Sequence, residues 1–464
     1  MQKLFDEVSS LDKRCYEEFG LSEDILMEHA SNGIANYIRK NFVLESKILI
    51  VCGGGNNGAD GIACARLLHK DYDVNIFYLK KPKSKMAILQ EKRAIVIKVN
   101  VCDEVCECDV LVDSIVGTGF KGEFNSEIKE IITKINSLNA FKIACDVPSS
   151  GFISDLTLTM GALKKSMFLD GAKDFMGQIK VLNLGISREI YEGESNWNLL
   201  DLEDLKLPYR TKKDSHKGSF GHLAVACGEK PGASILSASS ALRFGTGLVT
   251  LVGFNDNNIP DSIMYSHETP LNSTALALGM GLGDEFSDIE IDKFLDNSLP
   301  MICDADIFSI RREERGATLG VPIVLEILCR ENLVLTPHPK EFVSLLKITK
   351  LADIEIKELQ KNRFKYVELF CEKFPHITLL LKGANVIIAQ NDKFFINPHG
   401  TSALAKGGSG DILSGLVGAL LAQGNTTLES AINASLAHTK LALNYKGADF
   451  SLTPNDLIDG ICNL

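Results

Sequence analysis

The alternation of hydrophobic and polar positions divides the first part of the chain into short apolar runs and longer amphipathic runs. Short apolar runs are typical of buried strands, whereas apolar residues recurring every three or four positions are typical of helices. Helical patterns occur at residues 8–19, 25–39 and 63–70. The runs expected to form strands are residues 47–52, 74–79, 95–101, 110–115, 141–146 and 179–184. Strands that alternate with helices in this way predict βαβ units and a mostly parallel sheet.

A second series of the same kind follows a polar segment at residues 200–220. Its clearest helical patterns are residues 233–244 and 411–423. Its expected strands are residues 222–227, 248–253, 300–304, 333–336 and 378–381. We therefore expect two α/β domains, residues 1–205 and residues 206–464, each with its own core.

Composition adds limits on location and partners. The 464 residues are 45% hydrophobic, which is ample for more than one buried core. The chain has a net charge of −11 and lacks the broad basic surface of a nucleic-acid binder, so no nucleic-acid partner is expected. No run of 18 apolar residues occurs, so no membrane contact is expected either. Twelve scattered cysteines fit a cytoplasmic protein, and pairing of exposed N-terminal helices would make a homo-oligomer possible.

A glycine-rich loop, GGGNNGADG, follows the expected strand at residues 47–52. Gly53, Gly55 and Gly58 fit the spacing G-x-G-x-x-G, which places backbone N–H groups where they bind phosphate. A NAD-binding unit usually has an acid at the end of its second strand, but here Lys80 and Lys81 follow that strand. This argues against a conventional dehydrogenase. The basic run at residues 80–85 is typical of a solvated loop, and contact with a phosphate-bearing small molecule is the alternative.

The same loop carries two amides and a carboxylate, Asn56, Asn57 and Asp60. Their oxygens suit a hard cation or a sugar hydroxyl, while Asx-turn chemistry is the alternative explanation. Asp113 and Asp146 follow two further apolar runs. Because carboxylates just beyond the ends of parallel strands gather in the crevice where ligands bind, the three acids form a candidate site.

These segments resemble a known family. GGGNNGADG, DSIVGTG, DVPSSG and LMEHA are similar to the signature segments of the NAD(P)H-hydrate epimerases, over most of residues 1–200. The resemblance implies a Rossmann-like domain that racemises hydrated NADH and NADPH. It implies a potassium ion held by Asn57, Asp113 and Ser149, and Asp146 as the acid/base that contacts substrate. The residues implied to hold the hydrated dinucleotide are Asn56, Asn57, Gly58, Ala59, Asp60, Gly117, Thr118, Gly119, Phe120, Lys121, Gly122 and Glu123.

The chain departs from this family pattern in three places. Ala59 replaces a second glycine, which is acceptable if its φ is negative. Ser150 looks inserted after Ser149. The usual glycine-and-proline setting around a later lysine is replaced by GALKKSM at residues 161–167, and Lys164 is given no role.

A second glycine loop, GGSGD at residues 407–411, runs directly into a helical pattern. The N–H groups of Gly408, Ser409 and Gly410 are expected at the positive end of the helix dipole, where they form an anion hole. Asp411 is either an N-cap or a base that takes a hydroxyl proton during phosphoryl transfer, and the glycines before it favour the base.

The second half resembles the ribokinase-like small-molecule kinases, and more narrowly the ADP/ATP-dependent NAD(P)H-hydrate dehydratases. HKGSFGHLAVACG, GMGLG, LTPHPKEF, LLKGANVII and GTSALAKGGSGDILSG carry the resemblance over about residues 212–424. It implies that Asp411 deprotonates the C6 hydroxyl and that Ala233, Gly283 (less surely Gly281) and His338 contact the hydrated dinucleotide. Mg²⁺ is expected on the phosphates of ADP or ATP. The residues implied to bind that nucleotide are Lys382, Gly383, Ala384, Asn385, Val386, Thr401, Ser402, Ala403, Leu404, Ala405, Lys406, Gly407, Gly408, Ser409 and Gly410.

Together the two resemblances predict a bifunctional enzyme that repairs hydrated NADH and NADPH. Without the family, His338 between two prolines would be interpreted as an ordinary loop histidine, and Asp304 and Asp306 are left unassigned. The alternative is a vitamin-type kinase that carries a non-catalytic N-terminal ligand-binding module.

Overall fold

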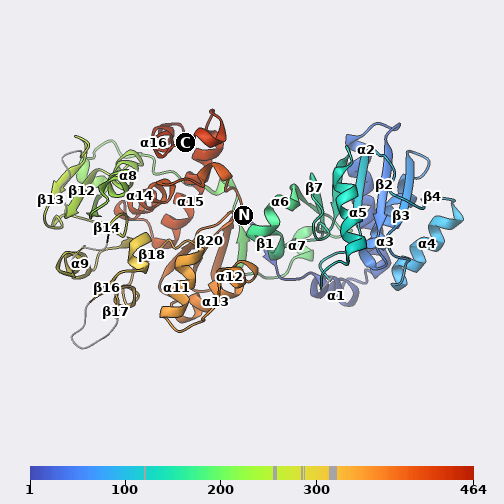
Figure 1. Ribbon diagram of the computed structural model, residues 1–464, viewed down its shortest axis with the longest axis horizontal. Coiled ribbons are helices and arrows are strands. Elements are labelled where there is room, and N and C mark those ends of the chain that lie inside the picture. The colour runs from blue at the N-terminus through green and yellow to red at the C-terminus, as the bar shows by residue number, and fades with distance from the viewer. Residues whose placement is uncertain (120–121, 254–258, 284–285, 287, 313–320) are drawn as a thin grey trace. The chain divides into compact units, whose positions relative to one another are not determined.

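The computed structural model describes residues 1–119, 122–253, 259–283, 286, 288–312 and 321–464. Contacts divide the chain into two compact units, Gln2–Ser195 and Asn196–Leu464 together with Met1. The division falls ahead of the expected boundary near residue 205, because β10 (Trp197–Leu199) pairs with β21 (Lys393–Asn397) of the second unit. Both units are α/β, as the sequence predicts (Figure 1).

The first unit contains a parallel sheet with the strand order β4-β3-β2-β5-β6-β7-β9. Its strands are β2 (Lys47–Cys52), β3 (Asp73–Tyr78), β4 (Asn100–Cys102), β5 (Val110–Ser114), β6 (Phe141–Cys145), β7 (Leu156–Met160) and β9 (Gln178–Leu182). The main helices are α2 (Glu23–Asn41), α3 (Asn56–Leu68), α4 (Lys85–Val96) and α5 (Ser126–Ser137).

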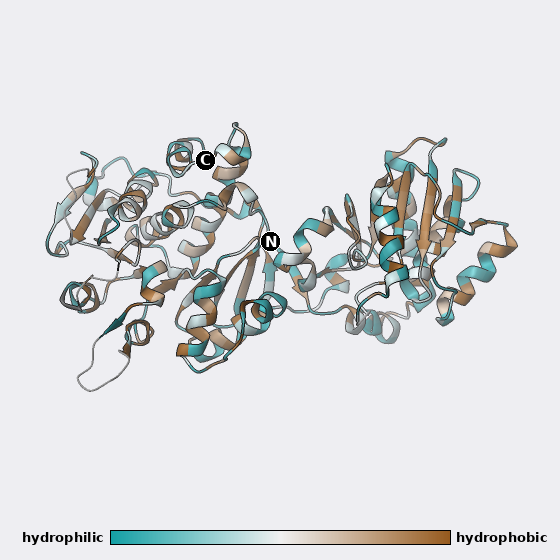
Figure 2. Ribbon diagram, viewed as in Figure 1, coloured by the Kyte–Doolittle hydropathy of each residue, from teal (hydrophilic) through white to brown (hydrophobic). Residues whose placement is uncertain are grey.

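Alternation along β2 shows how helices come to cover both faces of this sheet. Ile48 and Ile50 pack into a core shared with α2 and α3. Leu49 and Val51 pack into a second core, shared with α5. A strand buried on both faces has an almost continuous apolar sequence, and Figure 2 shows the central strands in brown. The unit is therefore a Rossmann-like, doubly wound domain.

Short elements complete the unit around one end of the sheet. β1 (Gln2–Phe5) pairs in parallel with β8 (Leu163–Lys164), and Phe5 lies opposite Lys164. This pairing brings the start of the chain next to a segment about 160 residues later. The other short helices are α1 (Ser9–Glu18), α6 (Lys173–Met176) and α7 (Arg188–Tyr191).

The second unit contains a sheet with the order β13-β12-β11-β14-β15-β18-β19-β20-β21-β10. The strands from β13 to β19 are parallel, and β20 is antiparallel to both of its neighbours. A separate antiparallel pair is formed by β16 (Arg311–Arg312) and β17 (Val321–Pro322). The other strands of the large sheet are β11 (His222–Cys227), β12 (Leu248–Gly253), β13 (Met264–Ser266), β14 (Ala275–Leu278), β15 (Met301–Cys303), β18 (Leu333–Leu335), β19 (Thr378–Leu381) and β20 (Val386–Gln390).

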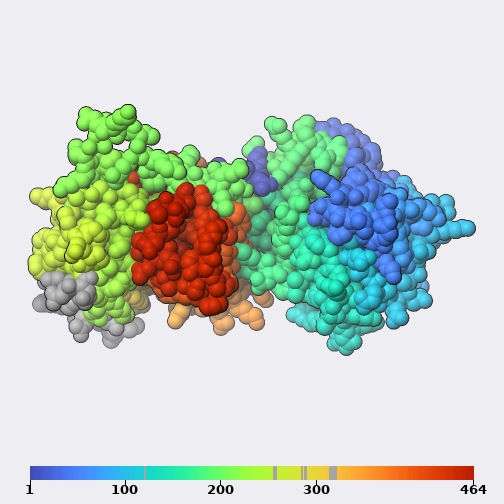
Figure 3. Space-filling view, turned by 90° about the horizontal axis from the view of Figure 1, so that it is seen from above, coloured from blue at the N-terminus to red at the C-terminus, as the bar shows by residue number. Residues whose placement is uncertain are grey.

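Helix α14 (Ser409–Ala422) lies at the centre of this unit and packs against α8 (Pro231–Arg243) and α15 (Thr427–Asn444). A Cβ on Gly415 would lie 2.0 Å from Ser240 Oγ, so glycine is required where α14 crosses α8. α16 (Pro454–Gly460) packs on the same three helices, and the C-terminal residues appear in red on the surface in Figure 3. The remaining helices are α9 (Asp288–Leu295), α10 (Val324–Ile327), α11 (Pro339–Ile348), α12 (Ile356–Lys361) and α13 (Arg363–Lys373).

One expected strand is wrong. Residues 95–101 were expected to form a strand because branched apolar residues fill the run, but the structure ends α4 at Val96. Ser84 caps α4, and the buried face of this helix packs on α3, so its last turn stays helical. Lys98 then turns the chain with a φ of 63°, and only residues 100–102 form a strand. Within the described residues, no helix is both long and apolar enough to cross a membrane.

Candidate functional sites

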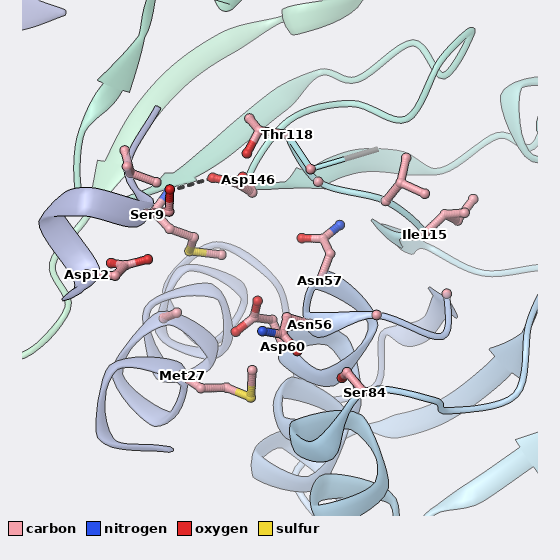
Figure 4. Close-up of a pocket in the computed structure, with 18 of the residues that line it drawn as sticks. Ser9, Asp12, Met27, Asn56, Asn57, Asp60, Ser84, Ile115, Thr118 and Asp146 are labelled. Carbon is pink, nitrogen blue, oxygen red and sulfur yellow. Dashed lines mark hydrogen bonds between the residues drawn. The ribbon is translucent and has the colours of Figure 1, made fainter. Parts of the chain in front are cut away.

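A cavity of about 1010 Å³ lies in the first unit, beyond the carboxyl ends of β2, β5 and β6 (Figure 4). This volume is at the upper end of the range for small-molecule sites. The predicted residues that line it are Asn56, Asn57, Asp60, Gly117, Thr118, Gly119 and Asp146. Strand ends far apart in the sequence therefore meet at one concave site.

The glycine loop forms the floor of this cavity by close backbone contact. A Cβ on Gly53 would lie 1.8 Å from Ile115 O, and a Cβ on Gly58 would lie 1.9 Å from Gly53 O. These two glycines let the loop cross β5 and turn into α3, whose first turn has no side-chain cap. Ala59 is buried inside α3 with a helical backbone, so its replacement of glycine introduces no strain.

Asp113 and Ser149 form a buried pair next to the loop. Asp113 accepts hydrogen bonds from Ser149 N at 2.7 Å, Ser149 Oγ at 2.8 Å and Ile115 N at 3.1 Å. Burial nevertheless raises the pKa of Asp113 to about 6. In the described part of the chain no lysine or arginine pairs with this carboxyl group, and Asn57 Nδ2 is buried without a hydrogen-bond partner. Two of the three expected potassium ligands are thus in contact, and both carry oxygen donors.

Asp146 directly follows β6 and has a φ of 69°, a conformation that costs a non-glycine residue about 1–3 kcal/mol. Lys164 Nζ lies 2.6 Å from Asp146 Oδ1 and 2.7 Å from Thr159 Oγ1. The side chain of Lys164 is fully buried, and that of Asp146 is 13% exposed. Sequence reasoning missed Lys164, although it occupies the GALKKSM segment, where the family has its later lysine.

Further acids face the same end of the cavity. Burial raises the pKa of Asp60 well above its usual range, and the nearby Asp146 raises it further. Burial also raises the pKa of Asp12, although Asp12 accepts a 2.7 Å hydrogen bond from Tyr191. Asp12 lies on the amphipathic helix α1, and nothing in its sequence setting indicated a role at the site.

Several predicted residues lie elsewhere. Gly58 and Ala59 are buried behind the loop and do not line the cavity. Gly122 and Glu123 do not line it either, and Glu123 forms an exposed ion pair with Lys129 at 3.6 Å. Phe120 and Lys121 lie outside the described residues.

The second unit has its own site at the start of α14. Gly408 has a φ of 89° and turns the chain into the helix. Lys382 Nζ contacts both carboxylate oxygens of Asp304, at 2.6 and 2.8 Å, and Ser414 donates to Asp304 at 2.7 Å. A Cβ on Gly410 would lie 3.4 Å from Lys382 Nζ, so this lysine lies beside the glycine loop.

Asp411 is part of this charged cluster. Burial raises its pKa to about 6, and the neighbouring Asp304 acts in the same direction. A carboxyl group with this pKa is poised to exchange protons near neutral pH. Asp306, to which the sequence assigns no role, accepts a 3.0 Å hydrogen bond from the backbone N–H of Gly283.

Two residues that sequence reasoning missed support the loop. His438 Nε2 lies 3.1 Å from Ser409 Oγ, and burial lowers the pKa of His438 to about 4, so the ring is neutral. Arg363 is buried under the turn after β19 and donates to the carbonyl groups of Asn385 and Lys382, at 3.1 and 3.0 Å. No short motif indicates either residue, because each contacts residues that are distant from it in the sequence.

The two expected nucleotide-binding segments are adjacent. A Cβ on Gly400 would lie 2.5 Å from Ala384 O, so residues 382–386 lie next to the start of residues 401–410. Ala233 lies beside Gly281, where an added Cβ would be 3.0 Å away. His338 caps α11, because its Nδ1 accepts from Lys340 N and Glu341 N at 3.1 and 3.2 Å. His338 therefore has a structural role as the cap of this helix, and a contact with substrate would be an additional role.

Of the three N–H groups expected to form an anion hole, that of Ser409 donates to Lys406 O at 3.2 Å. Each α/β unit therefore has its own cluster of acids, one at a large cavity and one at the start of a helix that follows a glycine loop, as in an enzyme with two sites for small molecules. Family models agree: residues 223–463 match NAD(P)H-hydrate dehydratase, and residues 23–166 match the YjeF-related protein N-terminus. The chain is 41% identical over 485 residues to a bifunctional NAD(P)H-hydrate repair enzyme of Helicobacter pylori, with both chains covered completely. It therefore belongs to the family of bifunctional NAD(P)H-hydrate repair enzymes.

Other proteins are similar to all or part of this chain. The Escherichia coli bifunctional repair enzyme is 26% identical, over 93% of this chain and 87% of its own. A solved Bacillus subtilis ADP/ATP-dependent NAD(P)H-hydrate dehydratase, co-crystallised with ATP and Mg²⁺, is 26% identical. The likeness covers 56% of this chain and 94% of that one, with a TM-score of 0.47.

Proposed function

We propose that this chain repairs hydrated NADH and NADPH in two steps. The first unit interconverts the R and S hydrates, and the second dehydrates the S hydrate with ADP or ATP. The observation that carries the proposal is that each unit has its own buried cluster of acids, around Asp146 at a ligand-sized cavity in the first unit and around Asp411 at the start of α14 in the second. The full-length likeness to bifunctional repair enzymes supports this pairing of activities.

In the first unit, Asp146 moves the proton of the hydroxyl group on C6. C6 also bonds to the ring nitrogen, so removing the hydroxyl proton lets the C6–N bond open to an aldehyde, and its electron pair passes to nitrogen. Closure on the opposite face, with return of the proton, inverts C6. Lys164 holds the Asp146 carboxylate by a 2.6 Å contact and keeps it aimed at the cavity.

A potassium ion fits the oxygen donors beside the loop. Asn57, Asp113 and Ser149 would hold it, and its charge would offset the desolvation that raises the pKa of Asp113 to about 6. Bound there, the ion would supply a fixed positive charge that orders the loops next to the substrate. Asn57 and Ser149 position those loops around Asp146.

In the second unit, Asp411 takes the C6 hydroxyl proton as the oxygen attacks the terminal phosphorus of the nucleotide. The N–H groups of Gly408 and Gly410 and the ammonium group of Lys382 stabilise the transferred phosphoryl group, while Ser409 N donates to Lys406 O at 3.2 Å and closes the loop. Phosphate then leaves C6 with the C6–O electron pair, and loss of a proton from C5 restores the ring double bond. Hydroxide, a poor leaving group, is thereby replaced by phosphate.

Mg²⁺ would accompany the nucleotide and neutralise part of its phosphate charge. In the described residues there is no group of three or more His, Cys, Asp or Glu side chains able to hold a metal alone. This fits a cation bound mainly by substrate phosphates and one or two carboxylates. Asp306, a neighbour of Asp411, is a carboxylate that would assist.

The alternative of a vitamin-type kinase with a non-catalytic N-terminal module is not favoured. The first unit has a large cavity with an ion-paired carboxylate, and the likeness to repair enzymes spans both units. A cytoplasmic location fits the twelve cysteines, which form no disulfide in the part of the chain that the structure describes.

The experiment offers the purified chain the S hydrate of NADH with ADP or with ATP and follows the absorbance of NADH. We expect NADH to form with wild-type protein and not with Asp411→Asn, which should still bind nucleotide. Accumulation of a stable phosphorylated product without NADH would support a kinase instead.

A further inference from the structure

The cavity of the first unit is lined by both acids and lysines. The acids Asp12, Asp60 and Asp146 lie close enough to one another to affect the pKa of Asp60, and the reaction is placed beside them. Two lysines, Lys80 and Lys83, line the same cavity beside the glycine loop. A ligand with anionic groups away from its reacting ring could use these lysines.

The lysine segment is fixed to the glycine loop. The backbone N–H groups of Lys83 and Ser84 both donate to Gly54 O, at 2.8 and 3.0 Å. A Cβ on Gly54 would lie 2.7 Å from Lys81 O, so the two segments are in direct backbone contact. Ser84 accepts from Ala87 N at 3.1 Å and starts α4 at this point. The ammonium groups are therefore presented from an ordered turn.

Neither Lys80 nor Lys83 has an ion-pair partner among the residues that the structure describes. Glu23 lines the same cavity, but its carboxylate accepts a 2.8 Å hydrogen bond from Asn56 Nδ2. Two ammonium groups at the wall of a substrate-sized cavity, held beside a phosphate-binding loop, are available to an anion of the ligand.

We propose that Lys80 and Lys83 bind the 2′-phosphate of hydrated NADPH, so that the first unit favours hydrated NADPH over hydrated NADH. This inference rests on the proposed epimerase function. The uncapped first turn of α3 suits the pyrophosphate. A dinucleotide with its pyrophosphate there places the adenosine ribose at the end of the next strand, β3. An acid at that position binds the ribose hydroxyl groups, whereas a cation binds a 2′-phosphate, and Lys80 lies two residues beyond β3.

The test compares a Lys80→Ala, Lys83→Ala double variant with a Lys81→Ala, Lys85→Ala double variant. Lys81 lies in the same turn and Lys85 begins α4; both are exposed and do not line the cavity, so the control removes equal charge. Epimerisation of each hydrate is measured with the full chain. We expect the kcat/KM ratio for hydrated NADPH over hydrated NADH to fall about tenfold or more in the first variant. The control should keep the wild-type ratio. An equal loss for both hydrates, or an unchanged ratio, overturns the assignment.

A binding measurement separates this inference from the epimerase function. Adenosine 2′,5′-bisphosphate and adenosine 5′-monophosphate are titrated into the full chain by calorimetry, with Mg²⁺ and ATP saturating the second unit. We expect the bisphosphate to bind more tightly to wild type and to lose that advantage only in the Lys80, Lys83 variant. If this advantage exists but neither hydrate is epimerised, the phosphate subsite stands and the epimerase proposal fails. If hydrates are epimerised but no such advantage exists, the subsite fails alone.

Discussion

Lys164 Nζ lies 2.6 Å from Asp146 Oδ1, and the Lys164 side chain is fully buried. Lys164 lies in β8, which pairs with β1, and its Nζ also contacts Thr159 of β7, the strand next to β6. A buried charge without a partner of opposite sign costs several kcal/mol, so each member of a buried ion pair is stable only while the other is present. The pair therefore links the stability of the first unit to the position of its reacting carboxylate.

Replacing Lys164 by methionine should destabilise the first unit by about 3–5 kcal/mol, because Asp146 would keep a buried charge without its partner. Adding Asp146→Asn should recover much of this loss, since no charge then remains. Chemical denaturation of the two single variants and the double variant measures the coupling. Strictly additive losses would show that the pair does not act as a unit.

Asp146→Asn should lower the rate of epimerisation by about two to four orders of magnitude, because the hydroxyl proton loses its acceptor. Dehydration of pure S hydrate should stay at the wild-type rate, because Asp411 and its surroundings are untouched. The measurement follows conversion of pure R hydrate with excess ATP. Wild-type turnover of the R hydrate by this variant would remove Asp146 from the mechanism.

Dehydration should depend on pH through Asp411. Its pKa is raised to about 6, and the base must be ionised to accept a proton, so activity should be full well above pH 6, about half-maximal near pH 6 and lower still below it. His438 adds no step in that range, because its pKa is lowered to about 4. A pH profile of kcat/KM for the S hydrate tests this; a flat profile down to pH 5 would contradict the role of Asp411.

Potassium should raise the melting temperature of the full chain above pH 6, and this gain should disappear as the pH falls through about 6. The direction of this pH dependence follows from Asp113. Its pKa is raised to about 6, so below that pH its carboxyl group is protonated and binds a cation poorly. Thermal unfolding in potassium chloride is compared with lithium chloride at equal ionic strength. Asn57→Ala should remove the difference, whereas equal stabilisation by both salts would exclude a potassium site.

Local patterns were sufficient to predict the strands and glycine loops that build both sites. Residues 47–52, 222–227, 248–253 and 378–381 form strands with the predicted bounds, because each is a short apolar run buried on both faces. The glycine loops follow such strands or begin a helix, so their neighbours in the sequence are also their neighbours in space.

Contacts between distant segments could not be predicted in this way. Lys164 in β8 contacts Asp146 at the end of β6, and His438 contacts Ser409 from the following helix. At residues 95–101 the local pattern is misleading. The β-branched residues predict a strand, but the packing of α4 on α3 keeps the start of this segment helical. Asp304, left unassigned, proves to be the partner of Lys382.

Complete recovery of NADH from a mixture of R and S hydrates tests the two-step repair most directly. The full chain is given the mixture with ADP or with ATP, and the fraction converted is measured over time. The account predicts that wild type converts the whole mixture and that Asp146→Asn converts only the S fraction at a comparable rate. Failure to form NADH with either nucleotide, or rapid conversion of only the S fraction by wild type, would contradict it.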